Sequence, residues 1–196
     1  GAVYSQGDEL DAIVEDLRGQ NVLTVDTGEY EQLLERLPWV DAARVTTDFP
    51  STATIEIAER RPIVFFAGSD GRFRVLDKHG RVLAVLDGQP IDYLQLVVDD
   101  GPNTAAGHFA PEGYRAAARL ASMFDAPLAD QVMEIHVDAA GDDLRLILAG
   151  EIEVLFGDTR DLVDKLVRLN VALLDPNPDN APTEQIDVST ADYVVR

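Results

Sequence analysis

The sequence predicts an α+β protein: a small N-terminal module of two helices on a short sheet, then a mostly antiparallel β-domain with two covering helices. Apolar residues recur at helical spacing in a few stretches, whereas most of the chain alternates apolar and polar residues in short runs bounded by Gly, Pro, Asn and Asp. At 196 residues and 46% hydrophobic content, the chain is long enough to bury a substantial core.

The N-terminal module begins with two predicted helices. Apolar side chains fall at i, i+3, i+4 and i+7 in residues 10–17 and again in residues 30–37, which indicates two short amphipathic helices. Asp26 is suited to cap the second helix, and Pro38 ends it because proline cannot continue the hydrogen-bonding pattern.

A hairpin is predicted to complete this module. Residues 40–49 and 52–58 read as two strands joined at the turn that contains Pro50 and Ser51. From Thr52 onward apolar and polar residues alternate, so one face of the second strand points to the helices.

A domain boundary is expected at Glu59-Arg60-Arg61-Pro62, where the pattern of the sequence changes. We therefore expect one domain over residues 1–59 and a second over residues 60–196. Pro62 favours this interpretation because it interrupts strand pairing at the point where the chain leaves the first sheet.

The second domain reads as serial hairpins, then a helix, a meander, a helix and a last strand. The predicted elements are strands at 63–67, 73–77, 81–86 and 93–98, a surface loop at 99–109, a helix at 111–124, strands at 132–137, 144–148 and 152–156, a helix from 158 or 159, and a strand near 184–189 that resumes at 193–196.

Charge and composition exclude several classes of function. Lys and Arg total 16 against 36 Asp and Glu, a formal net charge of −20, so the chain cannot easily form a basic face for nucleic acid or anionic lipid. With no cysteine, thiol catalysis, disulfides and cysteine-ligated metals are excluded. No apolar run approaches the length of a membrane span. The chain opens abruptly on Gly1, and we expect it to be a fragment of a longer protein.

The sequence offers little catalytic chemistry, and no catalytic, cofactor-binding or metal-binding residue is predicted. The three histidines, His79, His108 and His136, are scattered and are interpreted as surface residues. Residues 175–180 match the Asp-x-Asn-x-Asp start of a calcium loop, but the sixth position lacks Gly and the twelfth, Ile186, cannot ligate calcium. A proline-braced turn is the favoured interpretation, and a secreted calcium-dependent binder or hydrolase stays a minor alternative.

The middle of the first domain resembles a known family. Leu37-Pro38-Trp39-Val40, Phe49-Pro50-Ser51-Thr52 and Glu59-Arg60-Arg61-Pro62 follow each other in the signature order of the bacterial FtsQ/DivIB cell-division family. Residues 76–83 and 150–157 resemble later parts of that family, so the likeness covers nearly the whole chain. The structural signature then consists of Pro38, Trp39, Pro50, Ser51, Thr52, Glu59, Arg60 and Pro62.

The resemblance implies a POTRA module followed by the family's β-domain, both on the extracytoplasmic side of the cell membrane at the division septum. In that family one transmembrane helix, absent from this chain, anchors the protein, and a strand precedes the first POTRA helix. Gly1 resembles the end of that strand, so the first strand is expected to be truncated.

The resemblance also implies a scaffold, not an enzyme. Its expected partners are FtsB-like and FtsL-like single-span proteins and, through them, the septal peptidoglycan synthase complex. The family's partner adds a strand to the open edge of the β-domain. The matching candidate edge strand is Ile186, Asp187, Val188, Ser189, Thr190, Ala191, Asp192 and Tyr193. Asp187 and Asp192 suggest a partner segment that bears Lys or Arg. A POTRA-containing protein of another export or assembly system is the main alternative.

Overall fold

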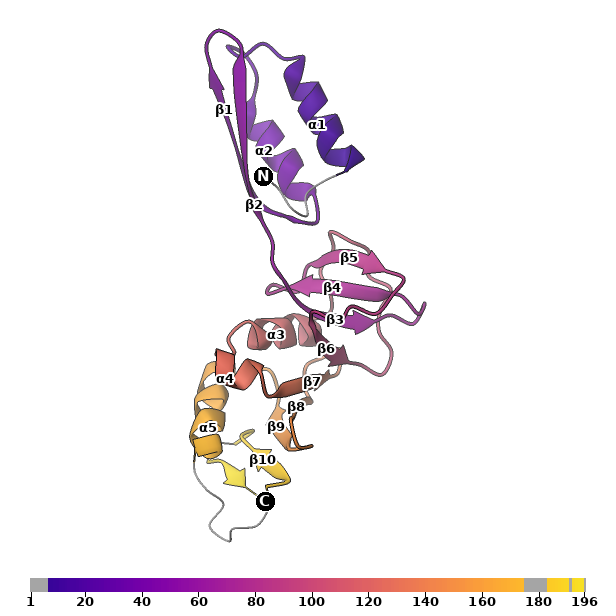
Figure 1. The fold of residues 1–196 in the computed structure, drawn as a ribbon, viewed down its shortest axis with the longest axis vertical. Coiled ribbons are helices and arrows are strands. Elements are labelled where there is room, and N and C mark those ends of the chain that lie inside the picture. Colours follow the sequence, from indigo (N-terminus) through magenta and orange to yellow (C-terminus); the bar gives the residue numbers. More distant parts are fainter. Residues whose placement is uncertain (1–6, 175–182, 191, 196) are drawn as a thin grey trace. The chain divides into compact units, whose positions relative to one another are not determined.

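The computed structural model describes residues 7–174, 183–190 and 192–195 (Figure 1). The chain divides into two compact units, Gly1–Arg61 and Pro62–Arg196. The expected truncated first strand falls on residues 1–6, which lie outside the described part of the chain.

The first unit contains the predicted two helices and hairpin. Helices α1 (Asp8–Arg18) and α2 (Thr27–Arg36) are followed by the antiparallel strands β1 (Val40–Asp48) and β2 (Thr52–Glu59). The hairpin is in register with Val45 opposite Ile55. This arrangement confirms the α+β class expected for the N-terminal part of the chain.

The small core of the first unit follows from the apolar spacing of its elements. One buried cluster contains Leu17 from α1, Tyr30 and Leu34 from α2, and Val45 from β1. Asp26 caps α2, because its carboxylate accepts from the amides of residues 28 and 29 at 3.1 and 3.3 Å. The cap fixes where α2 starts and hence which of its faces meets the sheet.

The second unit is built on a single mixed sheet of nine strands among the described residues (Figure 1). The strand order is β11-β10-β9-β8-β7-β6-β3-β4-β5. In chain order the strands are β3 (Pro62–Ala67), β4 (Phe73–Asp77), β5 (Val82–Leu86), β6 (Leu94–Val97), β7 (Val132–Val137), β8 (Leu144–Leu148), β9 (Glu153–Gly157), β10 (Gln185–Asp187) and β11 (Val194–Val195).

The expectation that the first four strands form serial hairpins is wrong at β6. After the hairpins β3–β4 and β4–β5, the link 87–93 carries the chain to the other side of β3, where β6 runs parallel to it. β6 is also parallel to β7, because the connection between them is a long crossover that contains helices. Strands β7, β8 and β9 form the predicted antiparallel meander.

Helices α3 (Glu112–Ala121) and α5 (Leu162–Leu174) are the two predicted covering helices, and a short helix α4 (Ala126–Ala129) is additional. Helix α3 ends at Ala121, before the predicted end at 124, and α4 lies beyond the predicted helix, where the Asp125 carboxylate caps it by accepting from the amide of Leu128 at 3.1 Å. Helix α5 starts later than predicted, since the preceding residue, Asp161, has a left-handed backbone with φ of 51°.

The main core lies between the sheet and its helices. Fully buried residues from both helices and from the middle strands form one cluster, in which the Tyr114 ring meets Phe66 edge-on at 5.0 Å. In the part of the chain that the structure describes, none of the helices combines the length and apolar character needed to cross a bilayer.

Candidate functional site

The predicted partner surface lies at the end of the sheet formed by β9, β10 and β11. Strand β10 pairs in parallel with β9, with Ile186 opposite Val154, and antiparallel with β11, with Ile186 opposite Val195. The outermost described strand at this end is therefore β11, whereas β10 has a neighbour on each side.

The candidate edge 186–193 is not one continuous strand, because its polar residues turn the chain. The strand predicted near 184–189 is shortened to β10, and its predicted resumption at 193–196 corresponds to β11. The Asp187 carboxylate accepts from the amide and the hydroxyl of Ser189 at 2.9 and 2.6 Å. The Thr190 hydroxyl donates to the carbonyl of Asp192 at 2.9 Å. These local hydrogen bonds return the chain antiparallel, as β11. Ala191, also named in the predicted site, lies outside the described residues.

Two buried side chains anchor this end of the sheet. Ile186 is 2% exposed and Val188 is fully buried, and both belong to the main core. The Val188 amide donates to the carbonyl of Leu155 at 2.9 Å, and its carbonyl accepts from Arg168 on α5 at 3.1 Å. Tyr193 packs partly buried against the same core. The edge therefore rests on a rigid base although its last strand is short.

The face of this region away from the helices carries a polar network centred on Glu153. The Glu153 carboxylate accepts from Gln185 at 2.9 Å and from Arg145 at 3.2 Å. The hydrogen bond from Gln185, and then Arg145, lower the pKa of Glu153, although burial opposes them. Each acceptor already has a donor, so the network supports the geometry of β8, β9 and β10 and lacks a poised acid or base.

Arg168 and Lys165 on α5 are structural residues for which the sequence predicted no specific contact. Lys165 is 4% exposed, and its ammonium donates to the carbonyl and the carboxylate of Asp158 at 2.8 and 2.7 Å. Hydrogen bonds from Arg160 and Lys165 hold the pKa of the Asp158 carboxyl well below its usual range. The sequence feature that could have indicated a buried, paired lysine was the position of Lys165 in line with the apolar stripe of the predicted helix.

Three of the signature residues, Pro38, Trp39 and Arg60, lie at one corner of the first unit. The amide of Arg60 donates to the carbonyl of Trp39 at 2.8 Å, and its guanidinium donates to the carbonyl of Val40 at 3.0 Å. The same side chain pairs with Asp41 at 3.1 Å and is 12% exposed. Arg60 thus ties the end of β2 to the start of β1. Pro38 and Trp39 are partly buried there.

The remaining signature residues lie at the tip of the hairpin and next to Arg60 and Arg61 in the sequence. Pro50, Ser51 and Thr52 lie exposed at the tip of the β1–β2 hairpin, whereas Glu59 and Pro62 are partly buried on either side of Arg60 and Arg61. The structure thus brings Trp39 and Arg60 together and keeps the hairpin tip apart from them. These placements are those of residues that shape the fold.

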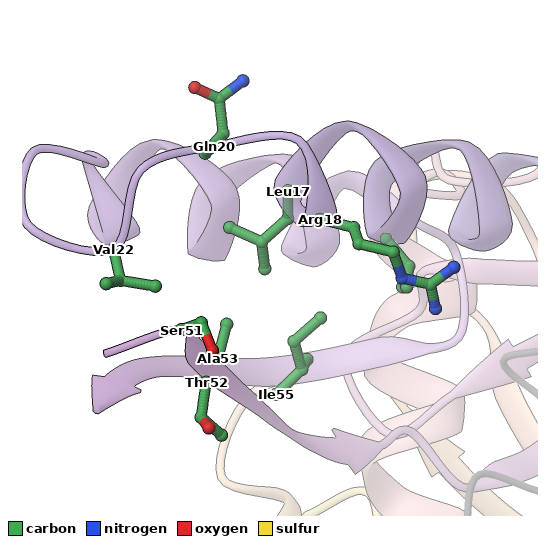
Figure 2. Close-up of a pocket in the computed structure, with 9 residues that line it drawn as sticks. Leu17, Arg18, Gln20, Val22, Ser51, Thr52, Ala53 and Ile55 are labelled. Carbon is green, nitrogen blue, oxygen red and sulfur yellow. The ribbon is translucent and has the colours of Figure 1, made fainter. Parts of the chain in front are cut away.

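A groove of about 310 Å³ opens beside the hairpin tip (Figure 2). It is lined by α1, the loop that follows α1 and the first half of β2. In Figure 2 the side chains of Leu17 and Ile55 point into it from opposite walls. Among the described residues β2 pairs with β1 alone, so the groove adjoins a strand with one unpaired edge.

The candidate chemical residues are not assembled into a centre. His79 lies in the β4–β5 turn, His108 in the loop before α3, and His136 on β7, where it contacts Glu134 at 3.1 Å. In the described ranges, no three His, Asp or Glu side chains are grouped so that they could hold a metal ion. The calcium-like stretch 175–180 lies outside those ranges, and Ile186, its twelfth position, is a core residue.

Comparison with known proteins identifies both units. Residues 1–60 match the POTRA domain of FtsQ type, and residues 66–189 match the C-terminal domain of the cell division protein FtsQ/DivIB.

Three relatives described as cell division protein FtsQ are similar over most of this chain. The protein of Corynebacterium glutamicum is 27% identical over 88% of this chain and 75% of its own length. The protein of Streptomyces griseus is 27% identical over 93% of this chain and 86% of its own length. The protein of Myxococcus fulvus is 31% identical over 78% of this chain, and the match covers 54% of the length of the Myxococcus protein.

Proposed function

Because the chain belongs to the FtsQ/DivIB family of cell-division proteins, we propose that it acts as an extracytoplasmic scaffold of the division machinery. The family is not enzymatic. In this proposal the chain binds FtsB-like and FtsL-like single-span proteins and thereby recruits and regulates the septal peptidoglycan synthase. Its anchor is a single transmembrane helix outside this chain.

The observation that carries the proposal is the sheet end at β11. An outermost strand presents unpaired N–H and C=O groups, which a partner segment can use to extend the sheet. The base beneath it is already ordered, since Ile186 and Val188 are buried in the core. Binding then orders mainly the partner, which lowers the entropic cost of association.

The side chains near the edge suggest what the partner segment carries. Val194 is 42% exposed and supplies an apolar contact, and Asp192 is exposed beside it. The net charge of −20 adds a long-range preference for cations. We infer a segment that alternates apolar residues with Lys or Arg, because successive side chains of an added strand point to opposite faces of the sheet.

The FtsQ type of the matched POTRA domain favours a division scaffold over a component of another export or assembly system. Its match is followed in the same chain by the FtsQ/DivIB C-terminal domain. Depletion of the full-length protein tests this choice in cells. Long undivided cells are expected, whereas normal division with defective export would overturn it.

Titration of the 196-residue chain with the extracytoplasmic part of an FtsB-like protein from the same organism, followed by NMR, tests strand addition. We expect saturable shifts centred on residues 185–195. Val188→Pro removes the amide that donates to Leu155 and is expected to abolish binding, whereas Val188→Ala keeps that amide and serves as the matched control.

A surface variant keeps the test independent of folding. Val194→Asp places a charge on the exposed side of β11 without touching the buried anchors, and it should weaken binding while the other resonances stay unchanged. Saturable binding that leaves residues 185–195 unshifted contradicts strand addition at this edge.

A further inference from the structure

A second surface lies near the end of the sheet opposite to the β11 edge, and its charge is opposite to the acidic charge of that edge. A pocket of about 250 Å³ opens between the β4–β5 turn and α3, and we call it the cationic pocket. Its lining includes Lys78, His79, Phe109, Glu112, Arg115 and Arg119. Strands β4 and β5 are the last two in the sheet order, whereas β11 is the first. The pocket is therefore separate from the proposed partner edge.

The charge of the pocket is unusual for this chain. Three cations, Lys78, Arg115 and Arg119, face one carboxylate, Glu112, in a protein with 16 Lys and Arg against 36 Asp and Glu. Within the described part of the chain, the side chains of Lys78 and Arg119 have no hydrogen bond or ion pair. Their charge is thus available to a ligand.

An aromatic ring completes the pocket. Phe109 is 53% exposed, and the guanidinium of Arg115 lies 5.5 Å from the centre of its ring. Arg115 also pairs with Glu112 at 2.9 Å, which holds both side chains against α3. The pocket therefore offers an apolar surface next to two unpaired cations.

The turn that carries Lys78 is fixed against the helix. Gly80 has φ of 75°, and a Cβ on it would lie 2.8 Å from the Cα of Arg115, so the turn touches the helix backbone. The carboxylate of Asp77, 2% exposed, accepts from the amides of His79 and Arg81 at 2.8 and 2.9 Å. These contacts place the turn beside α3 without help from a ligand.

The opposite wall is fixed in the same way. The amide of Val82 donates to the carbonyl of His108 at 2.8 Å, and the amide of Ala110 donates to the carbonyl of Gly80 at 2.9 Å. Phe109 lies between these two hydrogen bonds, so its exposed ring is held beside the cations. A preformed site of this kind binds without a large ordering cost.

We propose that the cationic pocket binds a short acidic segment of a partner protein, with carboxylates on Lys78 and Arg119 and an apolar side chain on Phe109. The volume is slightly below that of a typical small-molecule site, about 300–1,000 Å³, and suits one or two side chains. A net charge of −20 repels extended polyanions such as lipid surfaces, whereas a segment with a few carboxylates interacts chiefly with the local cations. This interaction is additional to strand addition at β11.

A fluorescein-labelled peptide, Glu-Glu-Phe-Glu-Glu, titrated into the 196-residue chain is the direct test, with Gln-Gln-Phe-Gln-Gln as its uncharged control. We expect saturable anisotropy with the acidic peptide alone, falling as NaCl rises. Lys78→Glu combined with Arg119→Glu should weaken binding about tenfold or more, because like charges then face each other. Phe109→Ala should weaken it about threefold.

Arg44→Glu is the control for charge reversal away from the pocket, since it reverses one exposed cation on β1 in the other unit. The affinity of this variant for the acidic peptide should equal that of the unchanged chain. All variants should keep the same melting temperature. Binding that is equal in the double variant and Arg44→Glu overturns the proposal. Tighter binding to phosphatidylglycerol vesicles than to the peptide, lost in the double variant, would overturn it in favour of a lipid ligand.

Discussion

Gly113 at the start of α3 lies directly against Gly141 in the β7–β8 turn. A Cβ on Gly113 would lie 3.0 Å from the Cα of Gly141 and 2.1 Å from the carbonyl oxygen of Asp138. The Gly113 amide also donates to the carbonyl of Ala139 at 3.1 Å. Helix and turn thus touch backbone to backbone, which sets how closely α3 approaches the sheet.

Gly113→Ala is expected to destabilise the chain by about 2–3 kcal/mol, because the backbone atoms it meets cannot rotate away. The gain in helix propensity from Gly to Ala is about 1 kcal/mol and is too small to offset this. Chemical denaturation measures the effect. Gly88→Ala, where a Cβ meets nothing within 4 Å, is the control and should be nearly neutral.

Arg168→Met should loosen the β10–β11 end, because it removes the donor to the Val188 carbonyl. The loss of one hydrogen bond, about 1 kcal/mol, is expected to accelerate amide exchange at Val188 about fivefold. Arg168→Lys keeps a cationic donor and should show a smaller change. Unchanged protection in the methionine variant would show that α5 does not hold this edge.

The stability of the chain should fall as the pH drops below the ordinary pKa of an aspartate, 3.8, and Asp70 contributes to that fall. The hydrogen bond from the Arg74 guanidinium, which is 3% exposed, holds the pKa of the Asp70 carboxyl well below its usual range. A depressed carboxyl pKa stabilises the folded state above the unfolded pKa, and protonation removes that contribution.

Asp70→Asn tests this pH dependence. At pH 7 the variant should be less stable, since Arg74 loses its ionised partner. Between about pH 4 and pH 2 its stability should fall less steeply than that of the unchanged chain, as urea unfolding at each pH would show. Parallel pH profiles would contradict the assigned role of this pair.

We propose that the two units unfold as separate domains, the first before the second. The buried cluster of the first unit has four residues, and Leu34 is fully buried in it. Leu34→Ala should cost about 2–5 kcal/mol in that unit and leave exchange protection in β7 and β8 unchanged. Leu23→Ala, at a position 71% exposed, is the control. Equal loss of protection in both units would show that they unfold together.

Local patterns predicted most elements well. Leu144, Leu146 and Leu148 are all buried and alternate with half-buried residues, so the predicted bounds of this strand agree with β8. The resemblance to the FtsQ/DivIB family, taken from the run between Leu37 and Pro62, is confirmed by the matches to both units.

The errors arose where distant residues decide the structure. Strand β6 is short, and nothing within residues 94–97 shows that its neighbours are β3 and β7. The shorter β10 is an exception, because it ends at a local turn in which the Asp187 carboxylate accepts from Ser189, two residues further along the chain. The cationic pocket brings residues 78–79 beside residues 109–119, and only the folded sheet makes that contact.

The position of β6 has a kinetic consequence. Its neighbours begin two locally connected groups, β3–β4–β5 and β7–β8–β9, each made of antiparallel hairpins that can form early because their partners are close in sequence. β6 joins these groups through two parallel pairings, and each requires a long loop to close first. We therefore expect the joining of the groups at β6 to limit the refolding rate, so that substitutions at Leu96 slow refolding more than equally destabilising ones within β8.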